Sequence, residues 1–442
     1  MSRQREVLAR DTPRPASAAR PPARGDRAAE VLQLQRSIGN RAVARLVNPA
    51  PRRTLQRYES AEHLDLGDRY LRELADFAAT DAGKDWIAEN GLMAETAGLA
   101  SDPMLAGGKI NVNGVDLTPG EIVALSGDFY ESPEELEHAK PEELRELVAA
   151  IHKEQRGELK DPNALYESIT AKYRSENDRY LNLATRNQKH FAPGNRLEWK
   201  RLHTEALQMA KAAGTDDKAF NRALLYDAAA GHYLTDAYAS GHMFDRGRID
   251  TEIQAYITAH PPAPNDPQMA TYFTVVGSHM RDLVLKNIHD RLNNEGVEVT
   301  NGKGMKWRTY GDTQLSKAAD TQKIAAMALA FSRAQIYSAR KGADPEPADV
   351  IALMPDDATV KRVTEQAISY IPAAANDITG LIYRQRAIVG TKLPPGIAQI
   401  VESNITTIGN PGRQRQLEQL QDVQERTGIP QVAPSFTIFQ WK

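Results

Sequence analysis

Cysteine is absent from the 442 residues of this chain. Thiol catalysis, disulfide bonds and cysteine-type zinc sites are therefore excluded, and any metal must be held by histidine and carboxylate side chains. No stretch approaches the roughly 18 consecutive apolar residues of a membrane-spanning helix, so we expect no transmembrane segment. The first residues also lack the apolar segment of a secretory signal peptide, so we expect no export by that route.

Lysine is absent from residues 1–57, a segment that carries thirteen arginines and four acidic residues. Its net charge is therefore +9, whereas residues 58–442, with 42 basic and 54 acidic residues, carry −12. A basic leader on an acidic body is typical of a leader that docks on another molecule. The acidic body argues against a stable nucleic-acid partner.

The composition divides the chain into three parts. Residues 1–57 are rich in arginine, alanine and proline, which predicts a disordered leader with one short docking helix over 31–46. Residues 58–341 carry the helical patterns and the candidate site residues. Residues 342–442 are punctuated by proline, which predicts a C-terminal extension of short helical pieces, of unknown role.

Periodicity and turn residues predict the elements of these parts. We expect helices over 69–105, 134–153, 199–213, 220–240, 274–294, 313–340 and 414–426. We expect hairpin-like turns over 110–115 and 296–304, and a strand-like tail over 436–441.

The most informative pattern is His-x3-Asp-x5-His near the end of the helix predicted over 220–240. On a helix, His232 and Asp236 lie on one face, close enough to share one cation. His242 lies ten residues beyond His232, roughly 80° off that face. It therefore serves a neighbouring metal, or it is redirected where the helix ends at Gly241. Neutral imidazoles with a bridging carboxylate indicate zinc.

Further histidines and acids lie at helix ends or on facing helices, as a metal site in the core of a helical bundle requires. These residues are His63, Asp128, His190, His279 and His289. His63 lies in the first turn of a predicted helix, where the helix dipole does not stabilise a cation, which favours a ligand role. Asp128 follows a glycine just past an apolar helix, and His190 ends a helix shortly before a proline.

The order of these residues resembles zinc-dependent phospholipase C, which shares its superfamily with the single-strand-specific S1/P1 nucleases. The resemblance covers about residues 58–340 and is most specific at His190-Phe191 and at the motif of residues 232–242. It implies an all-α, multi-helix bundle of the zinc-dependent phospholipase C / P1 nuclease type that binds two or three zinc ions. It also implies an enzyme, a zinc-dependent phosphoric diester hydrolase.

The resemblance assigns the ligands of the first two ions. Asp128, His190, His232 and Asp236 are expected to hold the buried zinc, and Asp236 bridges to a second ion shared with His63. Asp128 is also expected to orient or deprotonate the attacking water as a general base.

The third zinc is expected on His242, together with a histidine and a carboxylate from the helix over 274–294. The family has His-x3-Glu there, whereas this chain has His-x2-Asp at His279 and His-x3-Asn at His289. Distance from the following Val-Thr pair favours His279, and the local spacing favours His289. Both histidines therefore stay open as ligands.

A second departure concerns the amino group of an N-terminal tryptophan, which the family uses as a zinc ligand. No tryptophan precedes His63 here. Three alternatives stay open: the leader is cleaved, which still leaves no tryptophan; Glu62 or Asp65 substitutes; or that zinc is weak or missing. We expect carboxylates such as Asp227 and Asp245 to hydrogen-bond the ligand imidazoles. The remaining histidines that we interpret as surface or core residues are His138, His152 and His203.

The sequence Leu-Gln-Arg-x-x-Gly-Asn-Arg-Ala-Val over residues 34–43 resembles the leader of proteins loaded into bacterial extracellular contractile injection systems. The two resemblances imply synthesis in a bacterial cytoplasm, export as cargo of the particle, and a phospholipase C-like effector or toxin that hydrolyses phospholipid or another phosphodiester. Two alternatives stay open: an S1/P1-type nuclease, and a non-catalytic structural cargo protein with a relict zinc site. The acidic body argues against the first, and the nearly complete ligand set argues against the second.

Overall fold

The structure is a computed structural model, and it describes residues 60–389 apart from 176–177, 181–182, 184–187 and 262–266. The predicted disordered leader with its docking helix lies outside the described residues. The same holds for the helix predicted over 414–426 and the strand-like tail over 436–441.

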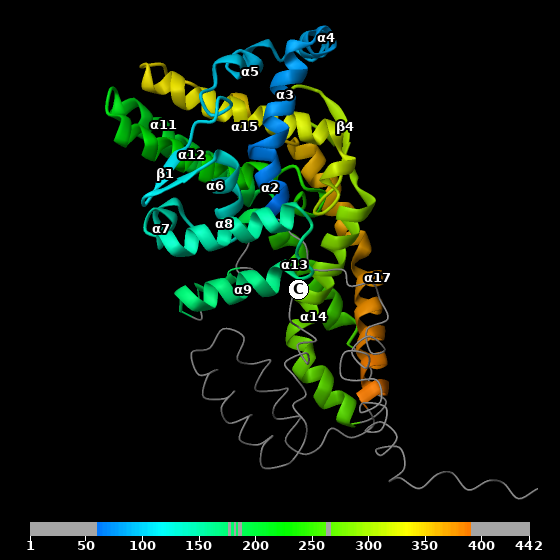
Figure 1. Ribbon diagram of the computed structural model, residues 1–442. Coiled ribbons are helices and arrows are strands. Elements are labelled where there is room, and N and C mark those ends of the chain that lie inside the picture. The colour runs from blue at the N-terminus through cyan, green and yellow to red at the C-terminus, as the bar shows by residue number, and fades with distance from the viewer. Residues whose placement is uncertain (1–59, 176–177, 181–182, 184–187, 262–266, 390–442) are drawn as a thin grey trace, which may run out of the picture. The chain divides into compact units, whose positions relative to one another are not determined.

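The described residues are mostly helical, which confirms the predicted all-α class (Figure 1). The first half contains α2 (Ser60–Gly67), α3 (Arg69–Ala79), α4 (Asp81–Glu89), α5 (Met93–Thr96), η1 (Leu99–Ser101), β1 (Ile110–Val112), β2 (Val115–Leu117), α6 (Pro119–Leu125), α7 (Pro133–Glu137), α8 (Pro141–Gln155), α9 (Pro162–Tyr173), η3 (Gln188–His190) and α11 (Gly194–Ala213). The second half contains α12 (Asp217–Asp236), η4 (Ser240–His242), α13 (Arg246–Ala259), α14 (Pro267–Glu295), β3 (Val297–Thr300), β4 (Lys306–Thr309), η5 (Leu315–Lys317), α15 (Ala319–Arg340), α16 (Pro347–Ile351) and α17 (Asp357–Val389). In the described part of the chain, the strands form two antiparallel hairpins, β1–β2 and β3–β4.

α12 is the central helix of the fold. Every residue from Ala223 to Asp236 is buried, because α11, α15 and α6 pack around it. Gly231 lets α15 and α6 approach closely, since a Cβ there would lie 2.8 Å from Leu329 and 3.1 Å from Val123. A helix buried on all sides places any polar residue of its last turn inside the core.

The start of α6 is fixed by a capping box. The Thr118 hydroxyl accepts from the Glu121 N–H at 3.1 Å, and the Glu121 carboxylate accepts from the Thr118 N–H at 2.8 Å. Asp68, at the end of α2, accepts from the Thr118 hydroxyl at 2.6 Å and from the Gly120 N–H at 3.0 Å. These contacts join α2, which contains His63, to α6, which ends shortly before Asp128.

Several predicted elements are shorter in the structure or are divided. The helix predicted over 69–105 is broken where Thr80 caps α4, and again at Gly91, whose φ of +65° no helix accommodates. The helix predicted over 134–153 is divided before Pro141, which begins α8. The helix predicted over 313–340 begins only at Ala319, because a loop and η5 occupy the first residues.

The proline-punctuated region from residue 342 contains one long helix instead of short pieces only. α17 continues through Pro372 over 33 residues and lies beside α14 (Figure 1). Val363, Ala367 and Ile371 are buried at helical spacing, so packing outweighs the loss of one backbone hydrogen bond at the proline. The region up to Ile378 therefore packs on the helical body. The described residues include no helix long and apolar enough to cross a membrane.

The ion pair between His152 on α8 and Glu121 on α6 should make stability depend on pH. The His152 Nε2 atom lies 2.8 Å from Glu121 Oε1, and this hydrogen bond raises the pKa of His152 above its ordinary 6.5. A raised pKa means that the stabilisation is complete below the unfolded pKa and is lost as the pH rises through the folded pKa. The melting-temperature deficit of His152→Gln should therefore shrink as the pH rises above 6.5.

Thermal melts of His138→Gln, which alters an exposed histidine, serve as the control and should show no such trend. A His152→Gln deficit that stays constant over this range contradicts the assignment of the pair.

Candidate metal centre

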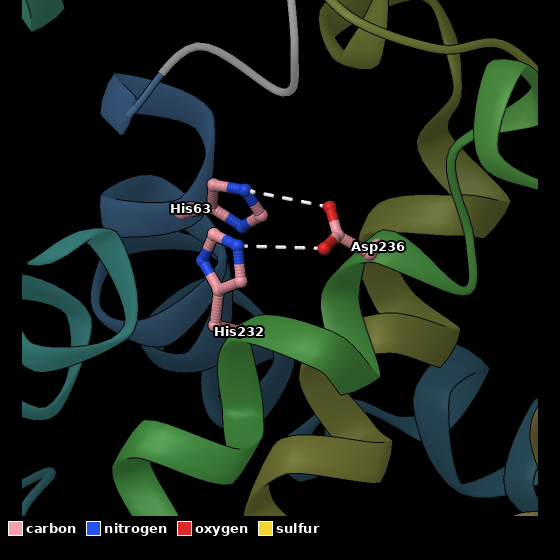
Figure 2. A group of neighbouring side chains, drawn as sticks. All are labelled: His63, His232 and Asp236. Carbon is pink, nitrogen blue, oxygen red and sulfur yellow. Dashed lines mark ion pairs between the residues drawn. The ribbon is translucent and has the colours of Figure 1, made fainter. Parts of the chain in front are cut away.

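His232 and Asp236 lie on one face of α12, just before the helix ends (Figure 2). Both side chains are buried, and the His232 Nε2 atom lies 3.4 Å from Asp236 Oδ2. The Nδ1–H of His232 donates to the Val123 carbonyl at 3.0 Å, which leaves the Nε2 lone pair facing the carboxylate. A neutral imidazole oriented in this way is the form that binds a metal ion.

His63 on α2 faces the same carboxylate (Figure 2). Its Nε2 atom lies 3.7 Å from Asp236 Oδ1, and its Nδ1 atom lies 2.7 Å from the Thr235 hydroxyl. Because that hydroxyl donates its proton to the His232 carbonyl at 2.8 Å, the Nδ1–H of His63 is the donor. Burial, and after it the neighbouring His232, lowers the pKa of His63 to about 3, so this imidazole is neutral at physiological pH.

Asp128 and His190 lie on the other side of His232. Asp128 is buried in the turn after α6, where Gly127 has a φ of +71° and its backbone lies directly against the His232 ring. His190 ends η3, and its Nδ1 atom lies 2.8 Å from Asp236 Oδ2 and 3.1 Å from His232 Nε2. The ligand atoms of Asp128, His190 and His232 therefore lie within 4.8 Å of one another.

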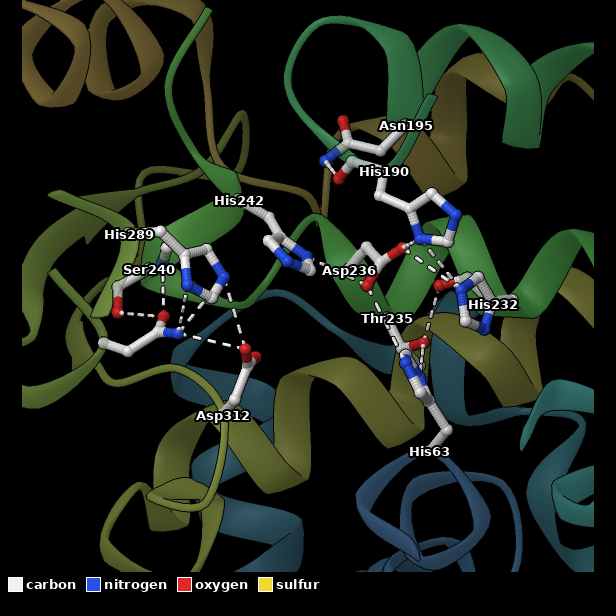
Figure 3. A network of polar contacts seen from close by, with 12 residues as sticks. His63, His190, Asn195, His232, Thr235, Asp236, Ser240, His242, His289 and Asp312 are labelled. Carbon is white, nitrogen blue, oxygen red and sulfur yellow. Dashed lines mark hydrogen bonds and ion pairs between the residues drawn. The ribbon is translucent and has the colours of Figure 1, made fainter. Parts of the chain in front are cut away.

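Asp236 is the shared carboxylate of the cluster. Its two oxygens lie within 4.0 Å of a nitrogen from each of His63, His190, His232 and His242 (Figure 3). Burial alone would raise the pKa of Asp236, but His232, His190 and His242 outweigh it and hold this pKa well below its ordinary value. A buried carboxylate that stays ionised among ligand nitrogens is suited to bridge two cations.

His242 connects this cluster to a further group (Figure 3). Its Nδ1–H donates to Asp236 Oδ1 at 3.0 Å, and its buried Nε2 atom has no hydrogen-bond partner within the described residues. The His242 ring lies 5.1 Å from the His289 ring, and His289 Nε2 lies 3.3 Å from Asp312 Oδ2. The second oxygen of Asp312, Oδ1, is also buried and without a hydrogen-bond partner in the same part of the chain.

The imidazole of His289 is protonated on both nitrogens, and therefore positively charged, at physiological pH when no metal is bound. Burial alone would lower its pKa, but the hydrogen bonds to Asp290 and Asp312 outweigh burial and raise the pKa to about 9. A metal ion bound by His289 must displace this proton, because only the neutral imidazole is a ligand.

The carboxylate of the third group differs from the one expected from the sequence. The helix over 274–294 supplies His289, but the acid comes from Asp312 in the loop after β4. Asp282 on the same helix is instead partly exposed and pairs with Arg281. Asn293 donates to Asp312 Oδ2 at 3.0 Å and accepts from the Gly241 N–H at 2.6 Å, so it supports the group. Asp312 follows Gly311, just as the candidate ligand Asp128 follows Gly127, and this repeated Gly-Asp pair is the one signal in the sequence that could have indicated Asp312.

Of the two histidines left open, His289 is the one that the structure brings to His242. His279 lies on the part of α14 whose side chains the structure does not describe. α12 ends at Asp236, and His242 lies on the separate η4 turn, so its direction is set by the chain after the helix.

The substitutes considered for the N-terminal tryptophan lie outside the three groups. Both carboxylate oxygens of Glu62 accept from backbone N–H groups, those of Thr313 at 3.0 Å and Leu315 at 3.1 Å. Asp65 accepts from Arg69 at 2.7 Å and from Gln155 at 2.6 Å.

The carboxylates expected behind the ligand imidazoles have other roles. Asp227 accepts from His203 at 2.8 Å and from Ser332 at 2.6 Å, in a buried network that joins α11, α12 and α15. Asp245 caps α13 by accepting from the Arg248 N–H at 3.0 Å. The ligand imidazoles are oriented instead by the Val123 carbonyl, the Thr235 hydroxyl and Asp236 itself.

The described residues therefore form three buried groups that could hold a metal ion. They are His63, His232 and Asp236; Asp128, His190 and His232; and His242, His289 and Asp312. Ligand atoms of one tetrahedral ion at about 2.1 Å lie roughly 3.4 Å apart, so small side-chain rotations suffice to close each group. In the third group, a cation would also satisfy His242 Nε2 and Asp312 Oδ1, which are buried and have no hydrogen-bond partner among the described residues.

No protein-family model, curated protein or solved structure matches this chain. The resemblance to zinc-dependent phospholipase C therefore rests on the sequence motifs. What the buried histidines and acids can do follows from their own geometry and chemistry.

Proposed function

We propose that this protein is a zinc-dependent phosphodiester hydrolase with a fold of the phospholipase C / P1 nuclease type. The observation that carries the proposal is the convergence of His63, Asp128, His190, His232 and Asp236 from four separate parts of the chain into one buried cluster. A protein rarely buries so many ionisable groups together unless they are paired or bind a metal.

The donor set supports zinc as the metal. Each group combines imidazole nitrogens with one carboxylate, a donor set that favours zinc over magnesium or calcium. The groups lie next to one another, because His232 belongs to two of them and Asp236 hydrogen-bonds a ligand of the third. Such an arrangement is typical of multinuclear hydrolase sites.

The chain's own residues have distinct roles in this proposal. Bound zinc supplies positive charge for the phosphate oxygens and lowers the pKa of the attacking water toward about 7. The Asp128 carboxylate accepts the proton of that water. Thr235 and the Val123 carbonyl keep His63 and His232 in the tautomer that faces the metal positions. Asp236, which lies within 4.0 Å of a nitrogen from each of four histidines, would be the carboxylate shared between neighbouring metal positions.

The substrate class follows from the charge of the body. Residues 58–442 carry a net charge of −12, which disfavours a long polyanion such as nucleic acid and leaves a small phosphodiester, such as a phospholipid headgroup, as the better substrate. The nuclease remains the second candidate because both enzymes use the same cluster.

Removal and return of zinc should switch the activity off and on. The purified full-length chain, loaded with zinc, should release phosphocholine from phosphatidylcholine liposomes. Treatment with a chelator should lower the rate more than about 100-fold, because several kcal/mol of transition-state stabilisation are lost. Re-added zinc should restore the rate, and magnesium should not.

Parallel assays distinguish the candidates. Hydrolysis of single-stranded DNA without release of phosphocholine would support the nuclease and contradict the phospholipase. Bound zinc without turnover of either substrate would contradict an enzyme and favour a structural metal centre.

A further inference from the structure

Two neighbouring residues of α2 contact opposite ends of the cluster. His63 belongs to the first group, with His232 and Asp236. Glu62 instead accepts two backbone hydrogen bonds from residues 311–315, the loop that carries Asp312 of the third group. One helix therefore supports a ligand directly at one end and a ligand-bearing loop at the other.

The 311–315 loop has a conformation that its own residues do not favour. Thr313 has a φ of +63°, which is strained for a β-branched side chain. The backbone at Gly311 is packed so closely on Asn293 that a Cβ would lie 1.5 Å from the Asn293 Oδ1 atom. Such a backbone persists only where surrounding contacts hold it, and the Glu62 carboxylate supplies two of them on either side of Gln314.

The position of Asp312 depends on this loop. Its Oδ2 atom lies 3.3 Å from His289 Nε2 and accepts from Asn293 at 3.0 Å, while Oδ1 is buried without a hydrogen-bond partner among the described residues. Rotation of the backbone at Thr313 would move the Asp312 carboxylate away from His289 and His242. A ligand on a loop holds its geometry only as well as the loop is held.

We infer that Glu62 is a positioning residue for the third metal position and acts on it through Asp312. This inference rests on the proposed metal centre, and it assigns Glu62 a role different from that of a ligand. It also means that α2 links the first and third positions, because a shift of this helix displaces His63 and the Glu62 carboxylate together.

Metal content tests the inference without any substrate. The full-length chain is dialysed against zinc, and bound zinc is measured by elemental analysis, with cobalt absorption spectra as a second readout. Glu62→Gln should lose the equivalent of one ion, or bind that ion about 10- to 100-fold more weakly, because loss of a contact that positions a metal ligand usually weakens metal affinity by this factor. The other ions should be retained. Asp65→Asn, three residues further along α2, is the matched control, because Asp65 accepts from Arg69 and Gln155 instead, and it should bind like the wild type.

The double variant separates a role through Asp312 from a general loss of structure. Asp312→Asn removes the ligand itself and should lose the same ion, and Glu62→Gln added to it should cause no further loss. Additive losses, or full and equally tight binding by Glu62→Gln, overturn the inference while leaving the proposed function in place. A wild-type chain that binds no zinc overturns both.

Discussion

Asp236→Asn should abolish binding of at least one zinc ion and lower phosphodiester hydrolysis by more than about 100-fold. The asparagine retains the size of the side chain but lacks the negative charge that lies among four histidine rings. A neutral amide bridges two cations poorly and offers only one oxygen as a ligand. The change therefore removes the carboxylate of the first group, and it also removes the acceptor of His242.

The matched control for this variant is Asp227→Asn. Asp227 is a buried carboxylate of the same helix that hydrogen-bonds a histidine and a serine, but it belongs to none of the three groups. Its variant should melt at a lower temperature and keep its zinc. If Asp236→Asn binds as much zinc as the wild type, by elemental analysis of the dialysed protein, the proposed bridging role is wrong.

Gly127→Ala should both destabilise the protein and displace a metal ligand. The φ of +71° strains any residue with a Cβ, and a Cβ here would lie 2.2 Å from His232 Cδ2 and 2.4 Å from His232 Nε2. The ring would have to move, and it is held by the Val123 carbonyl within a packed core. We expect a loss of more than about 2 kcal/mol in the free energy of unfolding, together with loss of zinc.

Gly157→Ala separates the two causes. Gly157 has nearly the same backbone, with a φ of +67°, but no atom lies within 4 Å of the added Cβ. This control should lose only about 1–2 kcal/mol, the cost of the left-handed backbone, and should retain its zinc. Denaturant unfolding and zinc content measured side by side decide the matter, and equal effects of the two substitutions would contradict the packing argument.

The part of the site that depends on local spacing was predictable. His232 and Asp236 are four residues apart on a helix, and a helix places such a pair on one face wherever the helix lies. The sequence also indicated that His242 leaves this face, and the structure shows how, since α12 ends at Asp236 and a separate turn carries His242.

Spacing along a helix could not identify Asp312, because its place depends on tertiary contacts. It lies in an irregular loop whose conformation is set by Glu62 and Asn293, residues far from it in the sequence. The sequence analysis placed the carboxylate on the helix over 274–294, where Asp282 follows His279 by three residues, but Asp282 is partly exposed and pairs with Arg281. Spacing along a helix identifies neighbours on that helix and says nothing of a ligand from a loop.

The long helix of the C-terminal region also depends on tertiary packing and could not be predicted from local sequence. Proline lowers the helix propensity of a segment on its own, which favoured short pieces around Pro372. The apolar stripe of Val363, Ala367 and Ile371 packs on the body and keeps one helix continuous. The role of the leader in delivery by a contractile injection particle stays a prediction from the sequence.

X-ray diffraction from zinc-loaded crystals, recorded on both sides of the zinc absorption edge, tests the central claim most directly. We expect anomalous peaks beside Asp236, between it and the imidazoles of His63, His190 and His232, and a further peak between His242, His289 and Asp312. Crystals that contain zinc but show no peak at any of these buried groups would contradict the metal centre and the hydrolase proposed from it.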